Sequence, residues 1–465
     1  MADGKNHISI VICGHVDAGK STTTGRLLFE LGDLDPRLLE KLTAIAKENG
    51  KESFKYAYVM DTQKDERERG VTISCQTKEF FTEKFHYTIV DAPGHRDYVG
   101  NMIRGSSQVD IALLMVPADG FITALSDGKD GGVKGQTREH AMLLNLLGVK
   151  QLIIGVNKMD SDSGTGPYSE EKYNEVCAEM RRTLKKVGWK PDVADNVPII
   201  PMSGFNGDNL IEKSTKMPWW TGVDVKVGSD TVKVHTLLDA LNDMARLPER
   251  KPDAPARVPI SAVIKKNGLI VCGRVEQGSI KPEDKVTFLP THTATNPCSG
   301  RIFSIEMHHK NVTSAGTGDN VGMMIKLDKE SQKPMEGDVM VLSSDKSLKT
   351  PKGFTAQIQV LDHPGQLKVG YCPVAYCRTA KSACRIAKIN WKIGRKSTGG
   401  KKLEDPAYVE ANDMAEVVFE PMQPFVVESF KDCEGLSRIA IMEGKNAVML
   451  GKAVSTSQEL VNPKK

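Results

Sequence analysis

The sequence lacks a long hydrophobic run. No stretch of about 18 uncharged apolar residues occurs in the chain, and a membrane-spanning helix requires such a stretch. The first residues, Met1–His7, also lack the apolar segment of a secretory signal peptide, and the apolar run Ile8–Cys13 is too short to supply one. We therefore expect a cytoplasmic protein with no membrane among its partners.

Paired cysteines are also missing. The nine cysteines are scattered and none stands in a C-x-x-C pair, which argues against a disulfide framework and against a zinc site. Charge of one sign is not dominant either, because 63 Lys and Arg face 59 Asp and Glu, for a net charge of +4. This mild excess is weak evidence for a polyanionic partner. Composition thus leaves an ordinary globular protein.

The first half of the chain alternates short apolar runs with helical patterns. Its length of 465 residues predicts about two to four domains. Strands that alternate with helices indicate a parallel sheet with crossover helices, and ligands bind at the carboxyl ends of such strands. The predicted strands are Ile8–Cys13, His86–Asp91, Ile111–Pro117 and Gln151–Asn157, and the predicted helices are Lys20–Leu31, Arg138–Leu147 and Ser169–Val187.

The pattern changes after a proline-rich stretch. Four prolines stand among charged residues within 247–259, which indicates an extended and fairly stiff linker. Short apolar segments separated by Gly, Pro and Asp turns follow, as is typical of β-barrels or sandwiches. These segments are Ile270–Val275, Lys285–Leu289, Asn320–Ile325, Thr355–Leu361, Ala415–Phe419 and Phe425–Glu428. We predict an α/β P-loop domain with a parallel-type sheet (1–243), a linker (244–257) and two small antiparallel β-barrels (258–345 and 346–465).

A phosphate-binding loop follows the first predicted strand. Residues 14–21 read G-x-x-x-x-G-K-S between a strand and a helix. The glycines let the backbone turn so that its N–H groups can face phosphates, and the helix N-terminus adds partial positive charge. Lys20 is predicted to neutralise the β- and γ-phosphates, and the Ser21 hydroxyl to coordinate Mg²⁺. The residues predicted to hold the nucleotide phosphates are Gly14, His15, Val16, Asp17, Ala18, Gly19, Lys20, Ser21 and Thr22.

Two further loops are candidates for reading the base. Residues 157–160, Asn-Lys-Met-Asp, follow a predicted strand. The Asp160 carboxylate can accept two hydrogen bonds from guanine, a donor pair that adenine does not offer. Asn157 is predicted to fix the loop, and the stem of Lys158 to cover the ring. The backbone of Ser203, Gly204 and Phe205 follows another apolar run and is a less specific candidate for binding guanine O6.

Two more segments are predicted to sense the γ-phosphate. In Asp-Ala-Pro-Gly-His, Asp91 ends a strand and can hold Mg²⁺ through water, while the N–H of Gly94 can reach the γ-phosphate. His95 is the candidate for orienting the attacking water, although a solvent-facing turn histidine is the open alternative. In Arg-Glu-Arg-Gly-Val-Thr-Ile, Thr72 offers its hydroxyl to Mg²⁺ and its backbone to the γ-phosphate. GTP would order both loops and hydrolysis would release them.

The predicted chemistry is in-line attack of water on the γ-phosphoryl group of GTP, to give GDP and phosphate. Lys20, Thr72 and His95 are the predicted catalytic residues, and Ser21, Thr72 and Asp91 the predicted Mg²⁺ ligands. Because no arginine can be assigned as an internal finger, we expect slow intrinsic turnover that a partner accelerates.

Several longer segments match a known pattern. In the first predicted domain they are Gly14–Thr24, Ser53–Asp61, Glu66–Ile73, Asp91–Asp97, Gly135–His140 and Gly148–Ser161. Beyond the linker they are Gly273–Gly278, Glu306–His309, Gly318–Gly322, Gly353–Gln357, Asp362–Gln366 and Lys401–Asp405. With these segments the chain resembles the translational GTPases, most of all the eukaryotic elongation factor 1-alpha family or its divergent elongation-factor-like branch.

The resemblance implies a carrier that binds aminoacyl-tRNA in the GTP state and delivers it to the ribosomal A site. It implies the ribosome and a guanine-nucleotide exchange factor as partners, and we expect a monomer. Asp17 matches a family position linked to a monovalent cation near the phosphates. The resemblance offers five residues as tRNA contacts, with an ordinary solvated or structural role as the open alternative for each: Lys55, Arg69, Arg274, Glu276 and His308.

The sequence departs from the elongation factor 1-alpha pattern in places. The segment before Gly273 is shorter, residues 120–135 differ from the family's acidic stretch, and Ile439–Ala447 lacks the arginines that the family places after its counterpart of Arg438. The lysine-rich tail of the family is missing. Two alternatives to a tRNA carrier stay open: an adaptor of termination or ribosome rescue, which binds a protein that mimics tRNA, and a GTPase subunit of a sulfate-activating enzyme. The missing N-terminal extension argues against the first of these.

Overall fold

The computed structural model of the protein describes residues 5–61, 76–93, 109–126, 135–162, 165–247, 250–265, 268–307, 310–329, 331–361, 363–444 and 446–459. The chain divides into two compact units, Met1–Pro248 and Glu249–Lys465. No helix in these ranges is long and apolar enough to cross a membrane.

The first unit is built on a six-stranded sheet with the order β2-β3-β1-β4-β5-β6. Every neighbouring pair runs parallel except β2 and β3. The strand β4 is buried along its whole length, as expected for a strand covered on both faces of a parallel sheet. The strands are β1 (Asn6–Gly14), β2 (Gln76–Phe81), β3 (Phe85–Asp91), β4 (Ile111–Pro117), β5 (Gln151–Asn157) and β6 (Ile199–Pro201).

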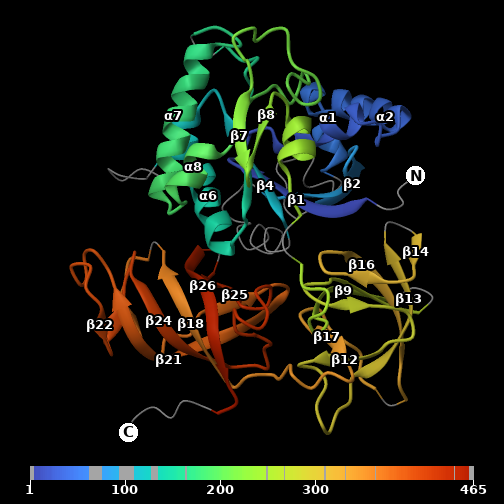
Figure 1. The fold of residues 1–465 in the computed structure, drawn as a ribbon, viewed down its shortest axis with the longest axis vertical. Coiled ribbons are helices and arrows are strands. Elements are labelled where there is room, and N and C mark those ends of the chain that lie inside the picture. Colours follow the sequence, from blue (N-terminus) through green and yellow to red (C-terminus); the bar gives the residue numbers. More distant parts are fainter. Residues whose placement is uncertain are drawn as a thin grey trace. The chain divides into compact units, whose positions relative to one another are not determined.

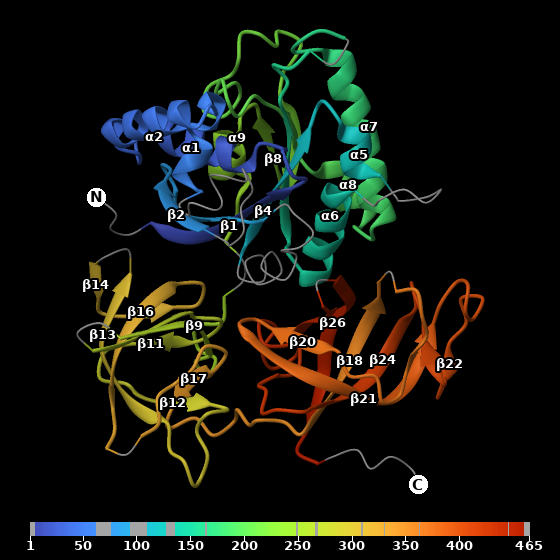
Figure 2. The ribbon, with the colours of Figure 1, turned by 180° about the vertical axis from the view of Figure 1, so that it is seen from behind.

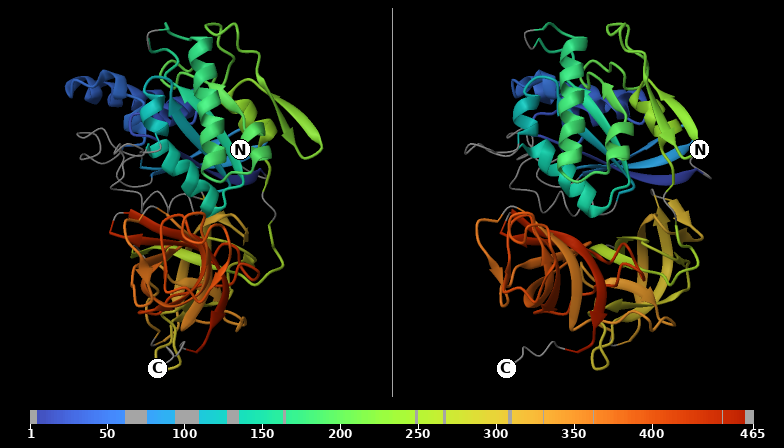
Figure 3. Two further views of the ribbon diagram at one scale, coloured as in Figure 1. Left: turned by 90° about the vertical axis from the view of Figure 1, so that its left-hand side faces the viewer. Right: turned by 60° about the vertical axis from the view of Figure 1, so that its left-hand side comes forward.

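Helices cover both faces of this sheet. In Figures 1 and 2, α1 and α2 lie on one side, and α6, α7 and α8 on the other, where α5 contacts α6 and α7. The helices are α1 (Lys20–Glu30), α2 (Pro36–Glu48), α5 (Phe121–Leu125), α6 (Gln136–Leu147), α7 (Glu170–Lys186), α8 (Pro191–Asn196) and α9 (Leu237–Asp239), with 3₁₀ turns η1 (Glu52–Phe54) and η2 (Ala57–Val59) and a π-turn η5 (Ala240–Met244). A hairpin, β7 (Val223–Val227) with β8 (Asp230–Val234), is the light green ribbon that projects from this unit in Figure 3.

The second unit contains two closed barrels. In the first barrel, six strands close through the order β12-β17-β9-β10-β16-β13 and back to β12, and β14 extends the sheet beyond β13. Its strands are β9 (Val258–Lys265), β10 (Leu269–Arg274), β12 (Lys285–Leu289), β13 (Ser299–Met307), β14 (Lys310–Val312), β16 (Asn320–Leu327) and β17 (Val339–Leu342), with a short separate pair β11 (Ser279–Ile280) and β15 (Ala315–Gly316).

The second barrel repeats this closure. Its strands follow the order β20-β25-β26-β18-β24-β21 and back to β20, and β22 extends the sheet beyond β21. They are β18 (Gly353–Val360), β20 (Val374–Cys377), β21 (Ala380–Ile393), β22 (Leu403–Glu404), β24 (Met414–Pro421), β25 (Arg438–Glu443) and β26 (Asn446–Ser457), with a short pair β19 (Leu367–Lys368) and β23 (Tyr408–Val409). The predicted fold class, an α/β domain followed by two antiparallel barrels, is confirmed.

The two barrels share a buried junction around Arg257, whose side chain is 2% exposed. Its guanidinium donates to both Glu428 carboxylate oxygens, at 2.8 and 3.1 Å, to Asp345 at 2.5 Å and to Ser347 at 2.8 Å. An apolar cluster adjoins it, formed by Val339, Val341, Leu348, Val426, Cys433 and Leu436. Asp345 ends the first predicted barrel (258–345), and Glu428 lies in the second (346–465). The contacts of Arg257 with both residues therefore join the two barrels.

One predicted strand is wrong. Phe425, Val426 and Val427 are buried and Glu428 is half-buried, but the segment forms no strand. The N–H of Glu428 donates to Leu436 O, outside any strand ladder. Phe425 and Val427 pack into the core of the second barrel, whereas Val426 packs into the junction cluster. The segment is apolar because it fills two cores, and an apolar run of this length does not distinguish that role from a strand.

Candidate functional site

The loop between β1 and α1 depends on glycine at both ends. Gly14 has φ of 145° and Gly19 has φ of 83°, backbone conformations that side chains disfavour. A Cβ at Gly14 would overlap the carbonyl oxygen of Met115, and one at Gly19 would overlap the side-chain amide of Asn157. The loop therefore lies directly against β4 and the end of β5, and it leads into the N-terminus of α1, whose first N–H groups have no acceptor within the helix.

The first amides of this loop are held by the start of α6. The N–H of Gly14 donates to His140 Nδ1, that of His15 to Thr137 Oγ1 and that of Val16 to Gln136 Oε1, each at 3.0 Å. Burial lowers the pKa of His140 to about 3, with the positive charge of Lys20 as a second cause, so the ring is neutral and can accept a hydrogen bond. These side chains brace the loop, and the sequence reasoning gave them no role.

Lys20 and Ser21 begin α1 close to the end of β3. The Lys20 side chain is 7% exposed, and its Nζ donates to His15 O at 3.0 Å. Burial lowers the pKa of Lys20, while the negative charge of Asp91 acts in the opposite direction. Ser21 Oγ donates to Asp91 Oδ2 at 2.7 Å. A hydroxyl and a buried carboxylate brought together in this way are hard oxygen donors of the kind that Mg²⁺ prefers.

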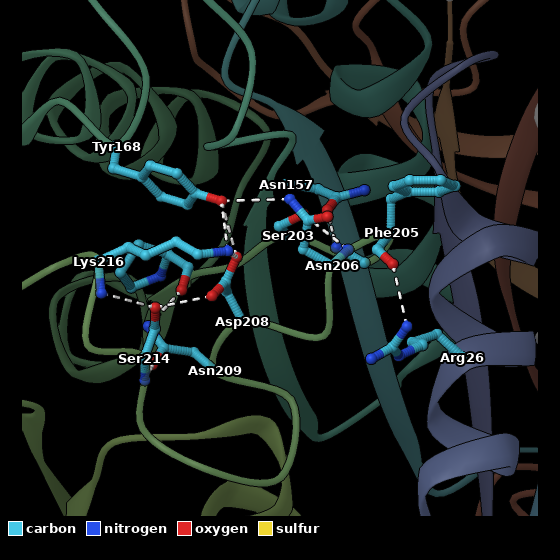
Figure 4. Close-up of polar contacts among 12 residues, drawn as sticks. Arg26, Asn157, Tyr168, Ser203, Phe205, Asn206, Asp208, Asn209, Ser214 and Lys216 are labelled. Atoms are coloured by element: carbon cyan, nitrogen blue, oxygen red, sulfur yellow. Dashed lines mark hydrogen bonds and ion pairs between the residues drawn. The ribbon is translucent and has the colours of Figure 1, made fainter. Parts of the chain in front are cut away.

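Asn157 joins the two loops that are predicted to read the base to the predicted phosphate loop. It is 2% exposed; its Nδ2 donates to Ala18 O at 2.8 Å, and its Oδ1 accepts from the N–H of Gly204 at 2.8 Å. Figure 4 shows Asn157 beside the Ser203–Phe205 loop. Since the three loops follow β1, β5 and β6, the carboxyl edge of the sheet brings them together, as expected for this fold class.

The remaining base-loop residues differ in exposure. Lys158 is exposed and adopts φ of 62°, while Asp160 is half-buried two positions later. Phe205 is 40% exposed, and its ring lies 6.3 Å from that of Tyr56, with Lys55 Nζ 5.8 Å from the ring centroid. An aromatic side chain thus lies beside the loop that is predicted to bind guanine.

The remaining predicted residues are either outside the described part of the chain or largely buried. Thr72, Gly94 and His95, together with the proposed tRNA contacts Arg69 and His308, lie outside the described residues. Arg274 is 7% exposed. Glu276 accepts from Arg378 at 2.7 Å with 7% of its side chain exposed, so its carboxylate joins the two barrels and is not an open tRNA contact.

Family models and solved structures match this chain along its length. The model of the elongation factor Tu GTP binding domain matches residues 5–246, that of elongation factor Tu domain 2 matches 268–341, and that of the GTP-eEF1A C-terminal domain-like family matches 353–454. The S. cerevisiae Ski7 GTPase-like domain bound to GTP is similar in fold, with a TM-score of 0.73, 17% identity and 97% of both chains covered. Sup35 complexed with GDP is 28% identical over 97% of this chain and 95% of that one, with a TM-score of 0.41. Because the family models match more than half of the chain, the chain belongs to the translational GTPases of the elongation factor Tu type.

Proposed function

We propose that this GTPase delivers aminoacyl-tRNA to the ribosomal A site during elongation, and that hydrolysis of GTP to GDP and phosphate is the release switch. The observation that carries the proposal is the joining of three nucleotide loops through Asn157, in a chain whose later regions match the second domain and the C-terminal domain of elongation factors. The expected partners are aminoacyl-tRNA, the ribosome and a nucleotide-exchange factor, for a cytoplasmic monomer.

The nucleotide would lie along the carboxyl edge of the sheet. The loop of Gly14–Thr22 and the ammonium of Lys20 would hold the phosphates, and Asp160 would accept the two guanine donors, with Ser203–Phe205 at O6. Because His140 and its neighbours already engage the amides of Gly14, His15 and Val16, the phosphate contacts fall to the later part of the loop and the start of α1.

Magnesium fits the donor set at Ser21 and Asp91, with Thr72 as the third proposed ligand. When bound, it would neutralise charge that develops on the β- and γ-phosphate oxygens. The protein's own residues do the rest: Lys20 holds a positive charge against the phosphates, His95 orients the water for in-line attack, and Thr72 holds its loop against the γ-phosphate. Asp17 lies within the phosphate loop with φ of 62°, and we propose the monovalent cation site beside it.

A filter-binding assay tests the carrier function. GTP-loaded and GDP-loaded protein are each titrated with charged and uncharged tRNA at fixed salt, because phosphate contacts make affinity depend on salt. Tight binding of only the GTP form to charged tRNA is the expected result. Equal affinity in all four combinations removes the carrier function and leaves the GTPase intact. GTP-dependent binding to a protein that mimics tRNA, with none to tRNA, would favour the termination or rescue adaptor.

A further inference from the structure

A tyrosine behind the base-reading edge is attached to the Asn157–Asp160 loop through its main chain. Tyr168 adopts φ of 60°, a left-handed conformation that bulky residues adopt only when the surrounding structure imposes it. Its N–H donates to Met159 O at 2.6 Å, and its carbonyl oxygen accepts from Trp219 Nε1 at 2.9 Å. The position of Tyr168 is therefore coupled directly to the loop that ends in Asp160.

The phenol of the same residue reaches the other base loop. Its hydroxyl donates to Asp208 Oδ2 at 2.9 Å and accepts from Asn206 Nδ2 at 3.2 Å and from Lys216 Nζ at 3.1 Å, as Figure 4 shows. One donor and two acceptor positions exhaust the capacity of a hydroxyl group. We call Tyr168, Asn206, Asp208 and Lys216 the outer bridge, because Asn157 joins the same loops on their inner side.

The far end of the outer bridge is fixed to the Ser203–Phe205 loop. The carbonyl of Asp208 accepts from the N–H of Ser203 at 3.2 Å, and the N–H of Asn206 donates to Ser203 Oγ at 3.1 Å. Asp208 is itself held by Ser214 Oγ, which donates to its Oδ1 at 2.7 Å. A movement of the phenol would therefore displace Asp208 and Asn206, and each of these is hydrogen-bonded to Ser203.

Charge and burial keep the outer bridge in one protonation state. Burial raises the pKa of Tyr168, and the hydrogen bond to Tyr168 raises the pKa of Lys216. At neutral pH the phenol keeps its proton and Lys216 keeps its charge, beside an Asp208 side chain that is 9% exposed. Asn206 and Asp208 also border an open hollow of about 450 Å³, which is lined by Glu30 and residues 206–208 and 211–215. On that side, packing alone does not hold these two residues in place.

We propose that Tyr168 is a positioning residue for base discrimination: through the outer bridge it sets the separation between the loop that carries Asp160 and the Ser203–Phe205 loop. This inference rests on the proposed guanine site. A residue that merely stabilised the domain would change binding of all nucleotides alike. A residue that sets Asp160 against the base must change the preference between nucleotides that differ only at the base edge.

The test uses the full chain and two diphosphates, GDP and IDP, which lacks the 2-amino group of guanine. Wild type is expected to prefer GDP, because Asp160 receives one more hydrogen bond from it. In Tyr168→Phe, the GDP-to-IDP affinity ratio is expected to fall about fivefold, the factor that corresponds to one hydrogen bond of about 1 kcal/mol. Lys216→Met removes one phenol contact at a half-exposed position, so it should fold, and it is expected to lower the ratio in the same direction.

Two controls separate the possible failures. Tyr87→Phe also deletes a hydroxyl that holds a backbone carbonyl, that of Leu241 at 2.7 Å, and should leave the ratio unchanged. Asp160→Asn should abolish the preference for GDP; if it does not, the proposed guanine site itself is wrong. If Asp160→Asn abolishes it while Tyr168→Phe and Lys216→Met keep the wild-type ratio, the positioning role of Tyr168 is overturned and the guanine site stands.

Discussion

The most direct test of the nucleotide site is Asn157→Ala. The substitution removes two buried hydrogen bonds, each of 2.8 Å. One is from Asn157 Nδ2 to Ala18 O, and the other is from the N–H of Gly204 to Asn157 Oδ1. A buried backbone group left without its partner costs about 1–3 kcal/mol. The two losses together predict a fall of about 2–6 kcal/mol in the free energy of unfolding of the first unit.

The proposed nucleotide site predicts weaker nucleotide binding as well, because Asn157 joins the three loops that we propose contact the ligand. We expect the affinity for GDP to fall at least about tenfold, which corresponds to about 1.4 kcal/mol. Calorimetric unfolding without nucleotide and equilibrium titration with GDP measure the two effects separately.

Asn196→Ala is the matched control for Asn157→Ala. Asn196 also makes two amide hydrogen bonds to the main chain, both to Lys226 at 2.8 and 2.9 Å, but on an exposed edge beside the β7–β8 hairpin. Water can replace these bonds, so unfolding and GDP affinity should both change little. If Asn157→Ala destabilised the unit but left GDP affinity within about twofold of wild type, about 0.4 kcal/mol, the joining of the loops would be structural only and the reasoning would fail.

Three further outcomes follow from the structure. Arg257→Ala should lower the unfolding free energy of the barrel pair by about 3–5 kcal/mol, since it leaves two carboxylates that are only 11% and 14% exposed without their counter-charge. Arg301→Ala, which breaks an exposed ion pair, should cost less than about 1 kcal/mol by calorimetry. His140 is neutral when folded, and its pKa of about 3 lies below the unfolded value, so the unfolded chain takes up the proton first and stability should fall as pH drops below about 6.5. The loss should reach about 2 kcal/mol at pH 5 and should disappear in His140→Gln; an unchanged slope in that variant would contradict the assignment. Gly204→Ala places a Cβ into Thr23 and should weaken GDP binding in titration, whereas unchanged binding would show that the loop moves freely there.

The sequence predicted the fold class, and it proposed as nucleotide loops the segments that the structure joins at Asn157. The G-x-x-x-x-G-K-S pattern and the Asn-Lys-Met-Asp segment could be recognised because their chemistry depends on neighbours in sequence. The strand ends then brought them together, since parallel strands align their carboxyl ends. The predicted helix Ser169–Val187 is observed as α7, with Ser169 as its N-cap and Val187 as its C-cap.

Contacts between distant segments were not predictable in the same way. Gln136, Thr137 and His140 lie in a segment that resembles the family, and their spacing of one, three and four positions places them in the first turns of one helix. Such spacing signals a shared face, yet it does not say what the face touches. Arg257 was assigned to the linker because of its proline-rich surroundings, and only its partners, 88 and 171 positions away, show its role.

The Arg257 junction has a consequence for how this chain can be divided. Expression of either barrel by itself would remove the counter-charge of Glu428 and would separate Glu276 from Arg378. It would also expose apolar side chains of the junction cluster to water. The smallest fragment of this half that should be soluble and cooperative is therefore the barrel pair. Truncated or recombined versions of this protein should therefore keep both barrels in one fragment.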